Sequence, residues 1–147
     1  MFESIVVGTD GSETASEAVR KAVELAQLCG PAARLHVVSA YKTLESMYLA
    51  PEVVSANLTG LIDPRGEAQG VVDEAAAKVR AEGVEVDTYV WPGDAASAIL
   101  DVAETAKADV IVVGNRGMGG VARFLLGSVP NKVAHHAPCT VLIVRTC

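Results

Sequence analysis

Residues 110–129 read VIVVGNRGMGGVARFLLGSV, a short β-branched run followed by a glycine-rich segment and a Gly-Ser pair. The apolar run after Asp109 is typical of a buried strand. Glycines directly beyond a strand let main-chain N–H groups approach a ligand that a Cβ would keep away. The Gly127-Ser128 pair can open a helix with Ser128 as its N-cap, and a helix N-terminus favours an anion. This stretch predicts a phosphate-binding strand, loop and helix start, with simple turn glycines and an ordinary cap as the alternative.

On either side of this stretch, the chain alternates between apolar runs and helical repeats. Strands are expected over residues 4–9, 35–40, 84–90, 108–114 and 140–144. Helices are expected after Ser12, Asp63-Pro64 and Gly93-Asp94 and over residues 128–136, because a capping residue precedes an apolar stripe of helical period. Residues 41–62 have no clean period and are expected to form a variable excursion, with room for a short helix.

The order of these elements decides the fold class. Parallel strands that alternate with helices are joined by right-handed crossovers, which leave helices on both faces of the sheet. We therefore predict an α/β fold, a Rossmann-like open parallel five-stranded sheet, forming a single domain over residues 1–147. Ligands of such sheets bind beyond the carboxyl ends of the strands, where the chain order reverses. The loops at 8–12 and 114–128 should be neighbours across that crevice.

Charge and hydropathy argue against several classes of partner. The chain has 12 basic and 18 acidic residues, a net charge of −6, which disfavours nucleic acid and anionic membranes. No apolar run approaches the roughly 20 residues of a membrane span, and no signal peptide is visible, so a cytoplasmic location is expected. Three cysteines without CxxC spacing argue against a disulfide framework or a zinc site. The basic residues Arg116, Arg123 and Lys132 near the glycine run suit a small anion.

No catalytic machinery is recognisable in the sequence. The P-loop pattern GxxxxGK[ST] and the HExxH motif are absent. His36 lies in an apolar strand and is interpreted as a packed histidine, while His135 and His136 fall in the last turn of a helix, where cations are favoured. The chain is expected to hold a nucleotide rather than turn it over. An ATPase or nucleotidyl-transfer enzyme is the alternative.

The glycine spacing carries a family resemblance. Gly114-x-x-Gly117, nine further residues and then Gly127-Ser128 resemble the G-2x-G-9x-G-S/T motif of the ATP-binding branch of the universal stress protein family. The opening IVVGTDGS at 5–12, Gly93-Asp94 and the last strand resemble the same family, so the similarity covers essentially the whole chain. It implies an adenine nucleotide alpha hydrolase-like domain that binds ATP with Mg²⁺ and regulates a stress response with little or no hydrolysis. Cyclic AMP is the alternative ligand, and a homodimer through Thr140–Val144, an apolar edge strand, is expected.

The resemblance also implies which residues hold the nucleotide, and it implies no catalytic residue. Main-chain amides lining the ribose and phosphates would come from Gly114, Asn115, Arg116, Gly117, Met118, Gly119 and Gly120. The phosphates would meet Gly127, Ser128 and Val129, with the Ser128 hydroxyl as an added donor. Gly8, Thr9 and Asp10 would form the pocket floor, with Asp10 reaching a ribose hydroxyl or the Mg²⁺. The main chain of Val37 would read the adenine edge.

Overall fold

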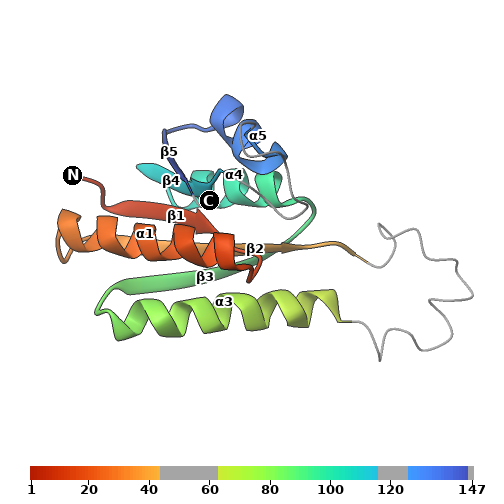
Figure 1. The fold of residues 1–147 in the computed structure, drawn as a ribbon, viewed down its shortest axis with the longest axis horizontal. Helices are drawn as coiled ribbons and strands as arrows, with labels where there is room; N and C mark the ends of the chain where they lie inside the picture. The colour runs from red at the N-terminus through yellow and green to blue at the C-terminus, as the bar shows by residue number, and fades with distance from the viewer. Residues whose placement is uncertain (44–62, 116–125, 146–147) are drawn as a thin grey trace, which may run out of the picture.

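The computed structural model describes residues 1–43, 63–115 and 126–145, and its elements alternate along the chain as expected (Figure 1). The strands are β1 (Ser4–Gly8), β2 (Arg34–Tyr41), β3 (Glu85–Pro92), β4 (Val110–Gly114) and β5 (Thr140–Val144). The helices are α1 (Glu13–Cys29), α3 (Pro64–Ala81), α4 (Ala95–Thr105) and α5 (Ser128–His136). None of the helices in these ranges is long and apolar enough to cross a membrane.

The five strands form one parallel sheet in the order β3-β2-β1-β4-β5. The predicted α/β fold is confirmed. From β1 the chain moves outward through β2 to β3, and then returns to the other side of β1 for β4 and β5. The order therefore reverses between β1 and β4, where Val7 is the register partner of Val112. Ligands of open α/β sheets bind at such a reversal.

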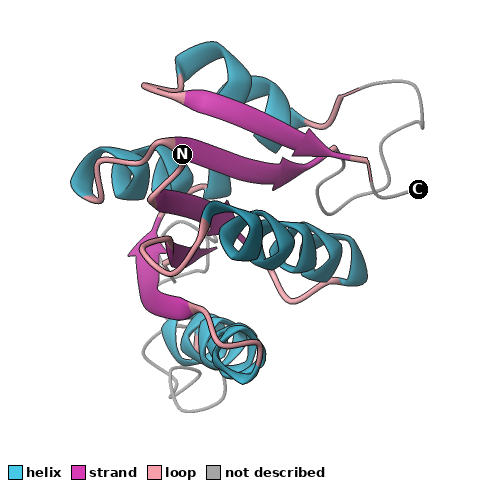
Figure 2. Cartoon of the chain, turned by 90° about the vertical axis from the view of Figure 1, so that its left-hand side faces the viewer, coloured by secondary structure: helices cyan, strands magenta, loops and turns pink. Residues whose placement is uncertain are grey.

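Helices cover both faces of the twisted sheet in two layers (Figure 2). Helices α1 and α3 share one hydrophobic cluster with the strand residues Ile5 and Val7. Helices α4 and α5 share a second cluster with Val6 on the opposite face. Because successive strand side chains point to opposite faces, β1 contributes to both clusters, and these three side chains are fully buried.

Side-chain caps fix the starts of three helices as the sequence predicts. Ser12 accepts a hydrogen bond from the Ala15 amide, Asp63 from Gly66 and Asp94 from Ser97. The start of α5 differs from the prediction: its N-cap is Gly127, and Ser128 is the first helical residue. The carbonyl of Gly127 accepts the first intrahelical bond, from the Asn131 amide, which makes Gly127 the N-cap, and a glycine has no side chain to cap the first-turn amides.

Four strands differ from their predicted bounds: β1 ends at Gly8, one residue early, and β2 is one residue longer at each end. Strand β4 begins at Val110 rather than at 108, because the Ala108 amide bonds to the Ala103 carbonyl and closes the end of α4. Strand β3 begins at Glu85, and its alternation of buried and exposed residues is lost after Asp87. The cause is aromatic contact: Tyr89 packs against both His36 and Trp91 on the face expected to be solvated.

Candidate functional site

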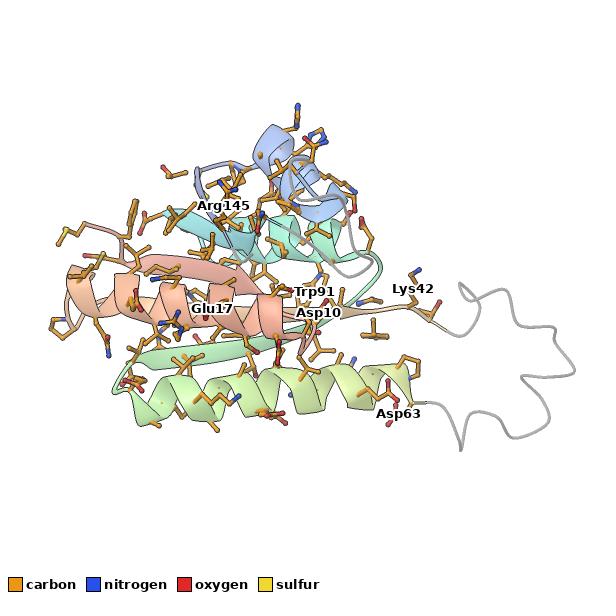
Figure 3. All side chains as sticks on the ribbon, viewed as in Figure 1. Asp10, Glu17, Lys42, Asp63, Trp91 and Arg145 are labelled. Carbon is orange, nitrogen blue, oxygen red and sulfur yellow. The ribbon has the colours of Figure 1, made fainter. Side chains whose placement is uncertain are left out.

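The two predicted ligand loops leave neighbouring strands at the point where the sheet order reverses. One follows Gly8 at the end of β1, and the other follows Gly114 at the end of β4. Asp10 in the first loop lies at the carboxyl edge of the sheet, on the same side of the molecule as Lys42 and Trp91 (Figure 3). The structure therefore brings the described parts of both loops to one edge. Arg116, Gly117, Met118, Gly119 and Gly120 lie outside the described residues.

The loop after β1 is held by its own hydrogen bonds. The Thr9 amide donates to the Val38 carbonyl at 2.9 Å, which extends the pairing of β1 with β2 by one bond. The Gly11 amide donates to the Thr9 hydroxyl at 3.2 Å, and the Ser12 amide to Asp10 Oδ1 at 2.9 Å. These amides are therefore bonded within the protein. A ligand at this loop would meet side chains, above all the exposed Asp10 carboxylate, which has further acceptor capacity.

The main chain at Gly8 is closely packed against Ile99. A Cβ at this position would lie 2.5 Å from Cδ1 and 2.9 Å from Cγ1 of Ile99, a buried residue of α4. Helix α4 therefore approaches the main chain at the end of β1 as closely as a glycine allows. The absence of a side chain at Gly8 has a structural cause that is independent of any ligand.

The ends of the second loop are fixed to the sheet and to each other. The Asn115 amide donates to the Val144 carbonyl of β5 at 2.8 Å, and the Asn115 carbonyl accepts from the Gly127 amide at 3.0 Å. The Gly127 amide is thus bonded within the protein, and a contact of Gly127 with phosphate stays a prediction. Strand β4, strand β5 and the start of α5 are joined at one place.

The first turn of α5 presents two unpaired amides. A helix leaves its first four N–H groups without intrahelical partners. Here the Gly127 amide is bonded to Asn115, and Pro130 has no N–H. The donors that remain are the amides of Ser128 and Val129, and within the described ranges neither has a hydrogen-bond acceptor. Ser128 is exposed and Val129 partly so, and these are residues that the sequence predicted to meet phosphates.

Lys132, in the middle of α5, bonds to the start of α4. Its Nζ lies 3.0 Å from Oδ2 of Asp94 and 2.9 Å from Oγ of Ser97. Hydrogen bonding from Ser97, followed by that from Lys132, lowers the pKa of Asp94. The sequence identified Asp94 only as a cap and Lys132 only as a nearby cation. Their pairing spans 38 residues and leaves no local pattern in the sequence.

Val37 lies inside the sheet. Its side chain is fully buried, and its register partners are Val7 in β1 and Thr88 in β3. Its main chain therefore runs between two neighbouring strands, and a contact with an adenine base stays a prediction. The adjacent His36 is also buried, and its Nδ1 lies 2.9 Å from the Tyr89 hydroxyl. This confirms its interpretation as a packed histidine.

One hollow lies near the carboxyl ends of the strands, and another lies at their amino ends. A cavity of about 90 Å³ lies beside Thr9 and Gly11, between α1 and α3. A larger hollow of about 620 Å³ lies at the amino ends of the strands and is lined by Met1, Phe2, Leu25, Leu28, Cys29 and Asp109. The larger hollow is therefore at the opposite ends of the strands from the two predicted ligand loops. Over the ranges that the structure describes, no group of three or more His, Cys, Asp or Glu side chains could hold a metal ion by itself.

Comparison with known proteins decides the family. Residues 1–145 match the universal stress protein family. The chain belongs to that family. This universal stress protein is 38% identical to one from Thermus aquaticus, with 99% of this chain and 100% of the relative aligned.

Solved structures of the family share its fold. A universal stress protein in complex with cAMP has 32% identity and a TM-score of 0.72, covering 99% of each chain. The universal stress protein from Archaeoglobus fulgidus in complex with dAMP has 26% identity and a TM-score of 0.67, covering 96% of each chain. The match along nearly the full length confirms the Rossmann-like fold predicted from the alternation of strands and helices.

Proposed function

We propose that this universal stress protein binds an adenine nucleotide, ATP with Mg²⁺, in the crevice between the ends of β1 and β4. The observation that carries the proposal concerns the amides of Ser128 and Val129, next to the predicted glycine-rich loop: neither has an acceptor among the residues that the structure describes. Unpaired N–H groups and the positive end of a helix dipole favour a phosphate. The complexes of related proteins with cAMP and dAMP support an adenine nucleotide as the ligand class.

The roles proposed for the other residues follow from their positions. The phosphates meet Ser128 and Val129, and the Ser128 hydroxyl adds a donor. The Asp10 carboxylate faces the ribose or the Mg²⁺ that accompanies the nucleotide, because Mg²⁺ is commonly held by one or two carboxylates together with substrate phosphates. Arg116, Gly117, Met118, Gly119 and Gly120 complete the loop around the phosphates, as the family motif implies.

Isothermal titration with ATP, cyclic AMP and adenosine tests the ligand. We expect ATP to bind more tightly with Mg²⁺ than without, and adenosine to bind weakly because it has no phosphate. Cyclic AMP is the second candidate, since a relative binds it and two amides are sufficient donors for a single phosphate. A folded protein that binds none of these compounds at millimolar concentration would contradict the proposal.

Replacing Ser128 tests the amide directly. Ser128→Pro removes the N–H at the first helical position, where proline is well tolerated, and the ψ of 165° at Gly127 suits a following proline. Ser128→Ala is the matched control, because it removes the hydroxyl and keeps the N–H. We expect Ser128→Pro to weaken ATP binding about ten- to a hundredfold, the range for one hydrogen bond to a charged group. Equal affinities in the two variants would show that the Ser128 amide does not bind phosphate.

We propose that the bound nucleotide regulates the protein in a stress response, with little or no hydrolysis. The sequence supplies no recognisable base for orienting a water molecule. Incubation with Mg²⁺-ATP should therefore release no product within minutes, whereas turnover in the ordinary enzymatic range of about 1–1,000 per second would favour an enzyme.

We also propose a homodimer through β5. This strand lies at the sheet edge, and its apolar Leu142 and Ile143 are 42% and 39% exposed. An exposed apolar edge favours pairing with another strand. A second copy of the chain, with its own β5, would cover these side chains.

A further inference from the structure

The bridge between Lys132, Asp94 and Ser97 connects the start of α4 with the middle of α5. One ammonium group donates to both the capping carboxylate and the hydroxyl in the first turn of α4. Asp94 uses its other oxygen, Oδ1, to accept from the Ser97 amide at 3.3 Å. Both oxygens of the cap are therefore in use, and a side chain of α5 supplies one of the donors.

Lys132 is the central residue of α5, one turn beyond the helix start at Ser128. Its side chain reaches the first turn of α4. Helices α4 and α5 pack together and start at the same edge of the sheet, so their positive ends are close. The Asp94 carboxylate offsets the positive end of the α4 dipole and the charge of the Lys132 ammonium group. The side chains of Lys132 and Asp94 are about half exposed, however, so the pair contributes little to global stability.

The bridge instead restrains the direction of the first turn of α5. Residues four apart lie on one face of a helix, so Lys132 is one turn from Ser128 on the same side. A contact from Lys132 to α4 would favour one rotation of α5 about its axis, and with it one direction of the Ser128 and Val129 amides. The bridge adds to other anchors of this nine-residue helix: Pro130 and Val133 are buried, and the Gly127 amide is bonded to Asn115.

The restraint continues to the end of β2. Gly93 immediately precedes the cap, and its amide donates to the Tyr41 carbonyl at 2.9 Å. Its φ of +115° is a conformation that favours glycine. A chain of direct contacts thus runs from β2 through Gly93, Asp94 and Lys132 to the middle of α5.

We infer that Lys132 is a positioning residue of the nucleotide site, which acts through Asp94 and Ser97 and does not bind the phosphate itself. This inference rests on the proposed function. The alternative is that Lys132 leaves Asp94 and binds the phosphate directly. The two roles give opposite results when the carboxylate is neutralised.

Two charge-neutralising variants separate these roles. Lys132→Met removes the cation, and Asp94→Asn removes the anion while an asparagine still caps α4. If Lys132 acts by positioning, both variants weaken ATP binding relative to adenosine, by about three- to tenfold, and the double variant is no worse than either single one. If Lys132 binds phosphate, Lys132→Met weakens ATP binding and Asp94→Asn strengthens it. That result would overturn the inference, as would an unchanged ratio of ATP to adenosine affinity.

Lys21 and Glu24 provide matched controls. They form a similar surface pair on α1, with a distance of 3.1 Å between Lys21 Nζ and Glu24 Oε2. Lys21→Met and Glu24→Gln change the net charge of the protein by the same amounts as the test variants. Neither should change the affinity ratio, so an effect confined to Lys132 and Asp94 is local.

A nucleotide-free measurement keeps this inference separate from the proposed function. In amide NMR spectra of the unliganded protein, Lys132→Met and Asp94→Asn should both shift the Ser128 and Val129 resonances. Unchanged resonances would overturn the positioning role whatever the protein binds. Shifted resonances in a protein that binds no nucleotide would support the restraint and contradict the proposed function alone.

Discussion

Ile99 occupies the space that a methyl group at Gly8 would need, with its Cδ1 2.5 Å from the position of a Cβ there. The two residues belong to different elements and lie far apart in sequence. Their contact places the N-terminal half of α4 directly on the end of β1, at the edge where the nucleotide is proposed to bind. A change at Gly8 is therefore expected to affect both the core around Ile99 and the carboxyl end of β1.

Gly8→Ala is expected to lower the free energy of unfolding by about 1–3 kcal/mol, because the added methyl group overpacks this contact. Ile99→Ala alone should lower it by about 2–5 kcal/mol, since it leaves a cavity. In the Ile99→Ala background, Gly8→Ala should be neutral or stabilising, because the new methyl group enters the vacated space. Urea denaturation of all four proteins measures the coupling, and additive effects would show that Ile99 does not restrict position 8.

His36 makes the stability of the protein depend on pH near neutrality. Burial lowers the pKa of His36; Asp87 opposes this shift, and Arg34 adds to it. The unfolded chain then takes up a proton at about pH 6.5, while the folded protein does so only at lower pH. The stabilisation from the neutral histidine is therefore complete above about pH 6.5 and is lost as the pH falls toward the folded pKa.

The matched experiment compares wild type with His36→Gln, whose amide can still bond to the Tyr89 hydroxyl. Urea denaturation at several pH values between 5 and 7 should show that wild type loses stability on acidification and that the variant loses less. Equal slopes for the two proteins would mean that His36 titrates alike in the folded and unfolded states.

Much of this architecture follows from local patterns. Ser12, Asp63 and Asp94 cap their helices as expected, because a capping side chain needs only an amide three residues away. The alternation of apolar runs and helical stripes likewise predicts the parallel sheet. At Gly127-Ser128 the local pattern predicts Ser128 as the cap, whereas the cap is Gly127, whose amide is bonded to the Asn115 carbonyl.

Contacts between elements that are distant in the chain could not be predicted from the sequence. The Lys132–Asp94 bridge and the Gly8–Ile99 contact depend on how α4 packs against α5 and β1. The periodicity of the sequence does not specify this packing. The same holds for β3, whose alternating pattern predicts a solvated face. Tyr89 and Trp91 partly cover that face, because the Tyr89 ring contacts both His36 on the neighbouring strand and the edge-on ring of Trp91.

Asp109 ties the entry of β1 to the entry of β4. Its Oδ2 accepts from the Glu3 amide at 2.8 Å and from the Ser4 amide at 2.9 Å, and these bonds, that from Ser4 foremost, lower the pKa of Asp109. The resulting stabilisation is present above the unfolded pKa of about 3.9 and is lost as the pH falls through the folded pKa. Asp109→Asn should lower the free energy of unfolding at pH 7 by about 1 kcal/mol, since water competes at this exposed site.

The same substitution should make the acid limb of the stability profile shallower below about pH 4. Thermal denaturation between pH 3 and pH 7 checks both effects. A variant with wild-type stability at pH 7 and an unchanged acid limb would show that the two hydrogen bonds do not distinguish the folded from the unfolded state.

The exposed edge of β5 yields the prediction on assembly. Leu142→Lys and Ile143→Lys place a charge in the proposed dimer contact, and burial of an unpaired charge is strongly unfavourable. Both variants should sediment as monomers in analytical ultracentrifugation at concentrations where wild type is a dimer. Leu28→Lys is the control, because Leu28 is 76% exposed near the end of α1, away from the strand edge, and its replacement should leave the dimer intact. A wild-type monomer would contradict the proposed assembly, and a dimer that survives both β5 substitutions would place the interface on another surface.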